Sequence, residues 1–371
     1  MDERKLYEIL GQDLEVPDMV NRKLQETYAL AVQKQPTAKR RGFRPLRTVL
    51  IAAAAAALLC GTAAAAYDFY TRQNVAVNEP QTVQGIVGGG QPSWERKEVY
   101  NEYGKLDHYW PNRETVAVDP AQAQALLGDY LPESGYQWQI EDYTFTVEGY
   151  VLDEHTGTAK FYYTMEHPGG FGEGAVDWEH GWLNNQVYKP SVMFETMSDV
   201  DRPWISGRTY VDVERSTQEK VCVVESAASM GGWKAEDGLH IRFIISGDEH
   251  EEDGRHYSED PIVDTYLDLP AVKSLPTRSA TDPVTGNTVE LSAIGLMLSC
   301  EDMDMVGYVA VDYADGARYV VWDRANNLDN SDHGLGSGDW PDMVMRYVFN
   351  RLVDPAQVTA VIVDSQRYEV G

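Results

Sequence analysis

The sequence is poor in cysteine and holds no familiar catalytic signature. Its 371 residues include three Cys, too few for a disulfide-dense scaffold or for a zinc site built from Cys alone. There is no Gly-rich phosphate loop, no G-x-S-x-G, no H-E-x-x-H and no paired C-x-x-C. The eight His residues are scattered, and none stands in a recognisable Ser/His/Asp order. We therefore expect no enzyme activity, no cofactor and no metal site.

Basic residues are also scarce. The chain has 31 Lys and Arg against 59 Asp and Glu, which gives a net charge of −28. Neutralising phosphates requires a basic surface, so this balance argues against nucleic acid as a partner. What the chain does have is apolar material, with 43% hydrophobic residues and 22 Tyr, 9 Trp and 8 Phe, enough to build a core. Its length predicts more than one domain.

One segment carries no charge and no Pro. Residues 49–66 read VLIAAAAAALLCGTAAAA, which is long enough to cross a bilayer of about 30 Å of hydrocarbon. We place the transmembrane helix at residues 49–67. Five basic residues precede it and Asp68 follows it, which predicts a single-pass cell-membrane protein with a cytoplasmic N-terminus and an extracellular C-terminal domain. The flanking basic residues are Lys39, Arg40, Arg41, Arg44 and Arg47.

Other interpretations of this segment are weaker. A cleaved signal peptide would end near Ala64-Ala65-Ala66, but the 48 residues before the span exceed the usual length of about 15–30 residues for a whole signal peptide. Lipidation of Cys60 would call for a small residue before it, and Leu59 is there. The span also holds Ala57 and Gly61 at small-xxx-small spacing, which suits helix pairing or entry to an intramembrane protease.

The span separates two pieces of opposite charge. Residues 1–48 have 10 basic and 7 acidic residues, a net of +3, which leaves 21 basic and 52 acidic residues beyond residue 66, a net of −31. Apolar residues in the first piece recur at helical spacing and predict two short amphipathic helices followed by a basic tether. So small a pair cannot bury its apolar stripes by itself, which favours a cytosolic partner as the surface that covers them. The alternatives are a frayed tail or a helix that lies on the inner leaflet. The stripes consist of Leu6, Ile9, Leu10, Val20, Leu24 and Tyr28.

The outer piece predicts a mainly β fold. Residues 68–118 are expected to act as a juxtamembrane spacer, and Asp119-Pro120 is expected to begin a short helix. Residues 143–165 then alternate apolar and polar side chains around a turn, as expected of a hairpin with one buried face. Similar alternation recurs in further segments up to the end of the chain, and no long helix is expected between the predicted strands. We expect an antiparallel β-sandwich-like region, divided into an extracellular β domain at 119–275 and a C-terminal β subdomain at 276–371.

Three features of the outer piece have alternative interpretations. The acidic run GDEHEEDGRH at residues 247–256 lacks the ligand spacing of a calcium loop and is expected to be a solvated loop. Cys222 and Cys300 fall outside the membrane, where either a disulfide or two buried thiols are permitted. An aromatic group could present a platform for a glycan, or could pack in the core. Its members are Trp178, Trp182, Tyr188 and Trp204.

The segments taken together resemble a known family. The N-terminus has a VPD helix start and an Arg-flanked span, RTVLIAAAAAALLCGTAAAAY, and the outer region contains YTFTVEGYVLDEHTGTAKFYYTME, LSAIGLML, YVAVDYADGARYVVWD and FNRLVDPAQVTAVIVDSQRYEV. This is similar to the Gram-positive single-pass proteins that carry domain of unknown function 4179, among them anti-sigma factors for extracytoplasmic-function sigma factors. The chain lacks a Cys/His zinc motif in residues 1–48, so sigma binding would rest on the helical stripes.

The resemblance implies a membrane-anchored signalling regulator. Its cytosolic N-terminus would bind a sigma factor, and its extracellular β region would sense the state of the envelope. The alternative from another class is an anchored surface-binding module that recognises a glycan or a protein and has no cytosolic regulatory role.

Overall fold

The computed structural model describes most of the chain beyond residue 71. The described residues are 72–75, 86, 93, 95–100, 103–133, 135–184, 187–196, 205–229, 234, 238–247, 249–252, 255–258, 261–300, 306–337 and 343–371. All of them belong to one compact unit that spans residues 64–371. The predicted cytosolic helices and the predicted span at 49–67 lie outside the described residues. Within the part that is described, no helix has the length and apolar character needed to span a bilayer.

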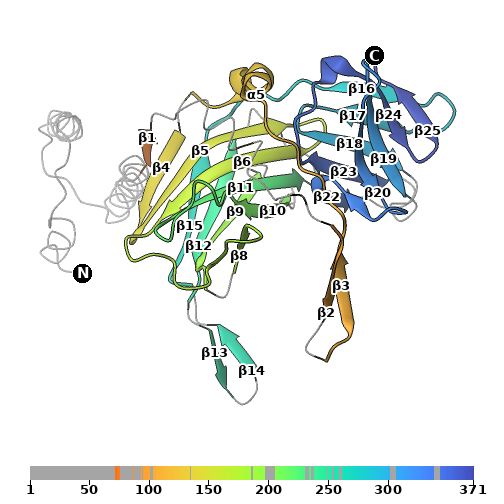
Figure 1. Ribbon diagram of the computed structural model, residues 1–371. Coiled ribbons are helices and arrows are strands. Elements are labelled where there is room, and N and C mark those ends of the chain that lie inside the picture. Colours follow the sequence, from red (N-terminus) through yellow and green to blue (C-terminus); the bar gives the residue numbers. More distant parts are fainter. Residues whose placement is uncertain are drawn as a thin grey trace, which may run out of the picture. The chain divides into compact units, whose positions relative to one another are not determined.

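The first β subdomain, strands β1 and β4 to β15, is built around a six-stranded antiparallel sheet (Figure 1). The sheet contains the long hairpin that the alternation at 143–165 predicts. Its strand order is β1-β4-β5-β6-β11-β10, with β1 at Arg72–Val75, β4 at Gly135–Ile140, β5 at Tyr143–Asp153, β6 at Thr158–Glu166, β11 at Lys220–Ser229 and β10 at Ile205–Val211.

A three-stranded sheet covers one face of the six-stranded sheet. Its order is β15-β12-β9, with β15 at Val263–Leu269, β12 at Leu239–Ile245 and β9 at Pro190–Thr196. The two sheets meet through aromatic side chains: the rings of Phe161 and Phe194 stack 3.6 Å apart, and Phe145 lies 5.4 Å from Phe243. β12 alternates strictly between buried and half-buried residues, as a strand with one core face should. The sandwich core therefore lies between these two sheets.

The C-terminal β subdomain is a second antiparallel sandwich. One five-stranded sheet has the order β16-β17-β18-β23-β22 and the other has β21-β20-β19-β24-β25, with a separate apolar core between them. The bounds are β16 Arg278–Thr281, β17 Thr288–Leu291, β18 Gly295–Cys300, β19 Tyr308–Tyr313, β20 Arg318–Asp323, β21 Leu328–Asp329, β22 Ser331–Ser337, β23 Met343–Phe349, β24 Val358–Val363 and β25 Gln366–Glu369; a 3-10 turn, η4, spans Pro355–Gln357.

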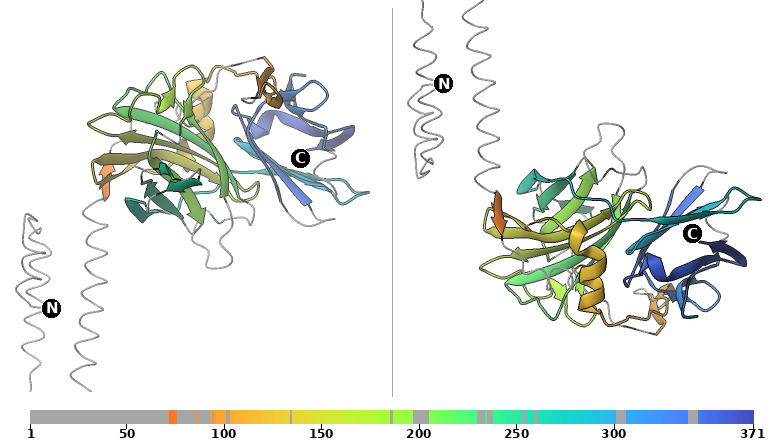
Figure 2. Two further views of the ribbon diagram at one scale, coloured as in Figure 1. Left: turned by 90° about the horizontal axis from the view of Figure 1, so that it is seen from below. Right: turned by 90° about the horizontal axis from the view of Figure 1, so that it is seen from above.

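The helix α5, at Pro120–Leu127, covers the other face of the six-stranded sheet (Figure 2). It begins as the sequence predicts, because the Asp119 carboxylate accepts hydrogen bonds from the Ala121 and Gln122 amides. A 3-10 turn, η1, continues it over Gly128–Tyr130. Leu127 packs with Val151 of β5 and with Ile294 of the C-terminal subdomain. The expectation of one buried face for the 143–165 hairpin is thus wrong, since α5 and the second subdomain bury its other face as well.

Residues 95–100 and 103–118, expected in a spacer, are part of the fold. The strands β2 (Lys97–Tyr100) and β3 (Leu106–Trp110) form a hairpin. The chain then runs beside β21, where Asn112 forms a parallel bridge with Leu328. The side chain of Asn350 donates to the Glu114 carbonyl over 2.7 Å. The segment around Asn112 and Glu114 is therefore held by the C-terminal subdomain.

A buried ion cluster joins the two subdomains. The Asp332 carboxylate of β22 pairs with Arg113 and lies 2.5 Å from the Lys160 ammonium of β6. Ser226 of β11 donates to the same carboxylate over 3.0 Å, and the Tyr210 hydroxyl donates to the Asp332 carbonyl. Burial alone raises the pKa of Asp332, but the two cations outweigh it and hold that pKa below its ordinary value. Each charge of the cluster thus has its partner in another part of the fold, and the Lys160–Asp332 pair crosses the subdomain junction.

Candidate functional site

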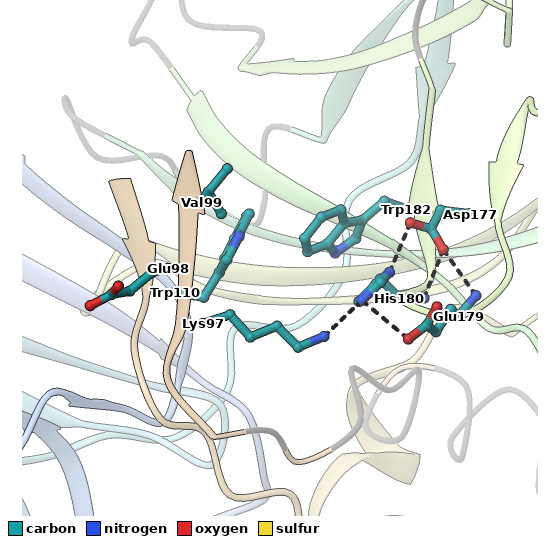
Figure 3. A pocket seen from close by; sticks show the side chains of 8 residues that line it. All are labelled: Lys97, Glu98, Val99, Trp110, Asp177, Glu179, His180 and Trp182. Atoms are coloured by element: carbon teal, nitrogen blue, oxygen red, sulfur yellow. Dashed lines mark hydrogen bonds and ion pairs between the residues drawn. The ribbon is translucent and has the colours of Figure 1, made fainter. Parts of the chain in front are cut away.

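A pocket of about 370 Å³ lies between the β2–β3 hairpin and a short two-stranded ribbon, β7 (Val176–Asp177) and β8 (Trp182–Leu183) (Figure 3). The hairpin supplies Lys97, Glu98, Val99 and Trp110 to its wall, and the ribbon supplies Asp177, Glu179, His180 and Trp182. Lys97 stands directly opposite Trp110 in the hairpin register, so the two share one face. That face is the one turned toward the ribbon.

The ribbon turn is held by hydrogen bonds to the side chain and the carbonyl of Asp177. Asp177 accepts from the amides of Glu179 and His180, at 2.9 and 3.0 Å, and its carbonyl accepts from the Gly181 amide. Gly181 has φ +71, and a Cβ there would lie 3.0 Å from the Val211 carbonyl oxygen. Only glycine takes up this conformation at so close an approach without strain. His180 and Trp182, which precede and follow this glycine, are thereby held at a rigid point of the backbone.

Three rings line the pocket. The Trp110 and Trp182 ring centroids are 4.5 Å apart with the planes tilted by 33°, and the His180 ring stacks on Trp182 at 5.2 Å (Figure 3). Pairs of aromatic rings at this spacing attract one another beyond the surface that they bury. The hairpin and the ribbon are therefore joined by a tryptophan contact that also forms an apolar wall.

The polar side of the pocket is a chain of three groups. Lys97 Nζ lies 2.9 Å from His180 Nε2, and His180 Nδ1 lies 2.8 Å from Asp177 Oδ2. An ammonium can only donate, so Nε2 accepts and the proton of a neutral imidazole sits on Nδ1, from which it is donated to Asp177. Burial by itself raises the pKa of Asp177, but the hydrogen bonds from His180 and Glu179 outweigh it and lower that pKa. Asp177 is thus held as a carboxylate.

The comparisons with known proteins do not supply a function. No family model matches the chain, and no curated protein matches it. A solved structure described as the conserved domain protein from Bacillus anthracis is similar to it, with 15% identity and a TM-score of 0.35, over 64% of this chain and 79% of that one. A likeness of that size says nothing about what this chain does.

The aromatic residues that the sequence suggested as a platform for a glycan do not form one surface in the structure. Trp182 lines the pocket, and Trp178, in the ribbon turn, is 43% exposed. Tyr188 is instead a core residue, 5.0 Å from the Phe171 ring, so the platform does not include it. Trp204 lies outside the described residues. The expectation of a glycan platform is thereby narrowed to the two ribbon tryptophans.

Several pocket residues were not expected from the sequence. Trp110 and Lys97 fall in a stretch without clean periodicity, and His180 is one of eight scattered histidines. The available signal was a Gly at position 104, which turns the β2–β3 hairpin with φ +69 between two aromatic-rich runs. Recognising that hairpin would have placed Lys97 and Trp110 together.

The two expectations for Cys222 were a disulfide to Cys300 and a buried thiol, and the structure has a free buried thiol. Its Sγ donates to the Arg215 carbonyl over 3.3 Å, and burial raises its pKa. It packs in the apolar cluster beneath α5, as a small hydrophobic residue does. The side chain of Cys300 lies outside the described residues.

The acidic run at 247–256 is not a simple loop. It forms most of a hairpin, β13 (Glu249–Glu252) and β14 (Arg255–Ser258), that extends from the sandwich (Figure 1). Among the side chains that the structure describes, no three His, Cys, Asp or Glu residues gather as a metal site would require. The predicted cytosolic stripe and the basic membrane flank, from Leu6 to Arg47, lie outside the described residues.

Proposed function

We propose that the chain is a membrane-anchored signalling regulator whose outer β unit binds a ligand in the Trp110–Trp182 pocket. The observation that carries the proposal is that pocket: a concave, aromatic-walled site with a few convergent polar groups, which is the usual form of a ligand site. Its wall is formed by two elements far apart in the chain, the β2–β3 hairpin and the β7–β8 ribbon, so a ligand there would contact both. Sensing, in this proposal, is binding at this site, and no catalytic step is involved.

The cytosolic half of the proposal rests on the sequence. The apolar stripe from Leu6 to Tyr28 has nothing within residues 1–48 large enough to cover it. A cytosolic sigma factor is the partner that the family resemblance implies. An amphipathic helix laid into a groove of that partner would hold it at the membrane. An intramembrane protease acting on the Ala-rich span would then release it.

Co-purification of the full chain with the cell's sigma factors tests this half. Leu24→Asp places a charge in the stripe, whereas Gln25→Asp places the same charge on the neighbouring, polar side of the helix. We expect the first variant to lose a sigma factor that the wild type and the second variant retain. If none of the sigma factors associates with the wild type, the regulatory function is wrong.

A second candidate is an anchored surface-binding module without a cytosolic role. The observation that favours it is the pair of ribbon tryptophans, Trp178 exposed and Trp182 in the pocket beside two carboxylates, since aromatic faces and hydrogen-bonding groups together suit a sugar ring. Glycan arrays with the wild type, Trp178→Ala and Trp182→Ala test it. Binding that both substitutions abolish, with no sigma factor bound, would favour this candidate over the regulator.

A further inference from the structure

The charge of the pocket selects among ligands. Its ribbon side has two carboxylates, on Asp177 and Glu179, against one cation, on Lys97, which donates to the His180 ring. The Glu98 carboxylate points away from the pocket and pairs with Arg96 (Figure 3). The pocket is therefore net negative beside two tryptophan rings, whose faces attract cations. The outer piece that surrounds it has a net charge of −31, which raises the local concentration of cationic ligands and repels anionic ones.

The pocket already holds an alkylammonium group, that of Lys97. Its Nζ donates to the neutral His180 ring over 2.9 Å (Figure 3). A hydrogen bond to a neutral acceptor is weaker than one to a carboxylate. The Glu179 carboxylate lies close by, 3.8 Å from the same imidazole nitrogen, and its side chain is 83% exposed. The ammonium group of a ligand could thus replace that of Lys97 at a low cost in free energy. It would also gain an ion pair with Glu179, the exposed carboxylate that an incoming ligand reaches first.

We propose that this pocket binds the alkylammonium group of a basic peptide, which displaces Lys97 and lies between the Trp182 ring and the carboxylates of Asp177 and Glu179. The inference rests on the proposed function and names the class of ligand that it senses. A peptide rather than a free amine fits the rim, because the hairpin next to the pocket exposes Tyr100 and Tyr103, at 55% and 77%, as apolar surface for a longer ligand. Displacing Lys97 frees the hairpin from the ribbon on their polar side.

The test uses the full chain in nanodiscs of neutral phosphatidylcholine, with hexalysine as the probe and titration calorimetry as the readout. Salt is kept at about 0.15 M, where charges more than about 8 Å apart are screened. Hexaglutamate and a neutral N-acetylglucosamine oligomer serve as comparison ligands. Circular dichroism confirms that each variant is folded.

Lys97→Met is the decisive variant. It removes the internal competitor, so we expect hexalysine to bind about threefold more tightly. Lys273→Met removes the same charge from an exposed position in the segment between the two subdomains and should leave the affinity unchanged. If the two Met variants bind hexalysine equally, Lys97 is no competitor and the inference is overturned.

Two further variants locate the ligand. Trp182→Leu should weaken hexalysine binding about tenfold through loss of the ring face. Glu179→Gln, on an exposed side chain that cannot disturb folding, should weaken it about threefold, whereas the exposed Glu219→Gln should not. If hexalysine binds all variants with the same affinity, its binding reflects a general attraction to an acidic protein, and the pocket is refuted as the binding site. A neutral oligosaccharide that binds in place of hexalysine refutes the cationic ligand.

The outcome is separable from that of the proposed function. Failure of hexalysine to bind, in a chain that still retains a sigma factor, would refute the ligand class alone. Hexalysine binding that depends on Lys97 and Trp182, in a chain that retains no sigma factor, would support the inference and refute the regulator.

Discussion

We expect Glu225 to make the stability of the unit at residues 64–371 depend on pH. It lies on β11 between Val223 and Ala227, on the face that carries the sandwich core, and its residue exposure is 6%. Among the described atoms, none forms a hydrogen bond with its Oε2. Thr209 of β10 stands opposite Glu225, and Gly207, two residues away on the same strand, is where a Cβ would come within 2.6 Å of Oε1, so the glycine leaves room for the carboxyl. A carboxylate buried in this way is costly.

The magnitude follows from the pKa. Burial raises the pKa of Glu225 from 4.5 to about 8. At about 1.4 kcal/mol for each pH unit, that difference corresponds to about 5 kcal/mol. The folded state favours the protonated form, so the full stability is present below pH 4.5. It is lost progressively as the pH rises towards about 8, above which the loss is complete.

Glu225→Gln should remove this dependence, because the amide stays neutral at every pH. We expect the variant to resemble the wild type near pH 5 and to be more stable by several kcal/mol near pH 9. Urea unfolding of the purified chain gives the free energies, and tryptophan fluorescence follows the unit at residues 64–371 alone, since all nine Trp lie beyond residue 66. The exposed Glu219→Gln is the matched control and should follow the wild type. Identical pH profiles for wild type and Glu225→Gln would refute the reasoning.

Three other predictions concern the junction, the ribbon and the buried thiol. Lys160→Met leaves the buried Asp332 with less cationic compensation, and urea unfolding should show a loss of about 3 kcal/mol or more; an unchanged midpoint would mean that the ion cluster does not hold the subdomains together. Gly181→Ala forces a side chain into φ +71 against the Val211 carbonyl, which should cost about 1–3 kcal/mol in the same assay and weaken ligand binding at the pocket. In a variant whose other two cysteines are Ala, Cys222 should react with a thiol reagent at the rate of unfolding, because it is buried and its pKa is raised; fast reaction in the folded protein would contradict its burial.

Much of the β architecture could be predicted from the sequence because it is encoded locally. The alternation at 143–165 indicates β5 and β6, and Asp119-Pro120 indicates the start of α5. Ala314-Asp315-Gly316 indicates the turn between β19 and β20, where Gly316 has φ +87. Each of these signals acts within a few residues, through side-chain periodicity, a cap or a permitted backbone angle.

No local signal in the sequence predicted that the β5–β6 hairpin is buried on its second face. Lys160 is charged and stands at a position that alternation assigns to solvent, yet it is buried against Asp332, which lies 172 residues further along the chain. A two-residue period tells whether a residue shares a face with its neighbours, but not what will cover that face. The partner became known only with the structure.

The sequence by itself determined the division of charge along the chain, the antiparallel β class of the unit at residues 64–371 and the positions of its local turns, since these depend on composition and on residues close together. The tertiary structure alone decided the pocket and the subdomain junction. Lys97 meets His180 across 83 residues, and Trp110 meets Trp182 across a similar separation. Such contacts are set by which faces pack and in what register, and those depend on the burial of the whole unit rather than on any one segment.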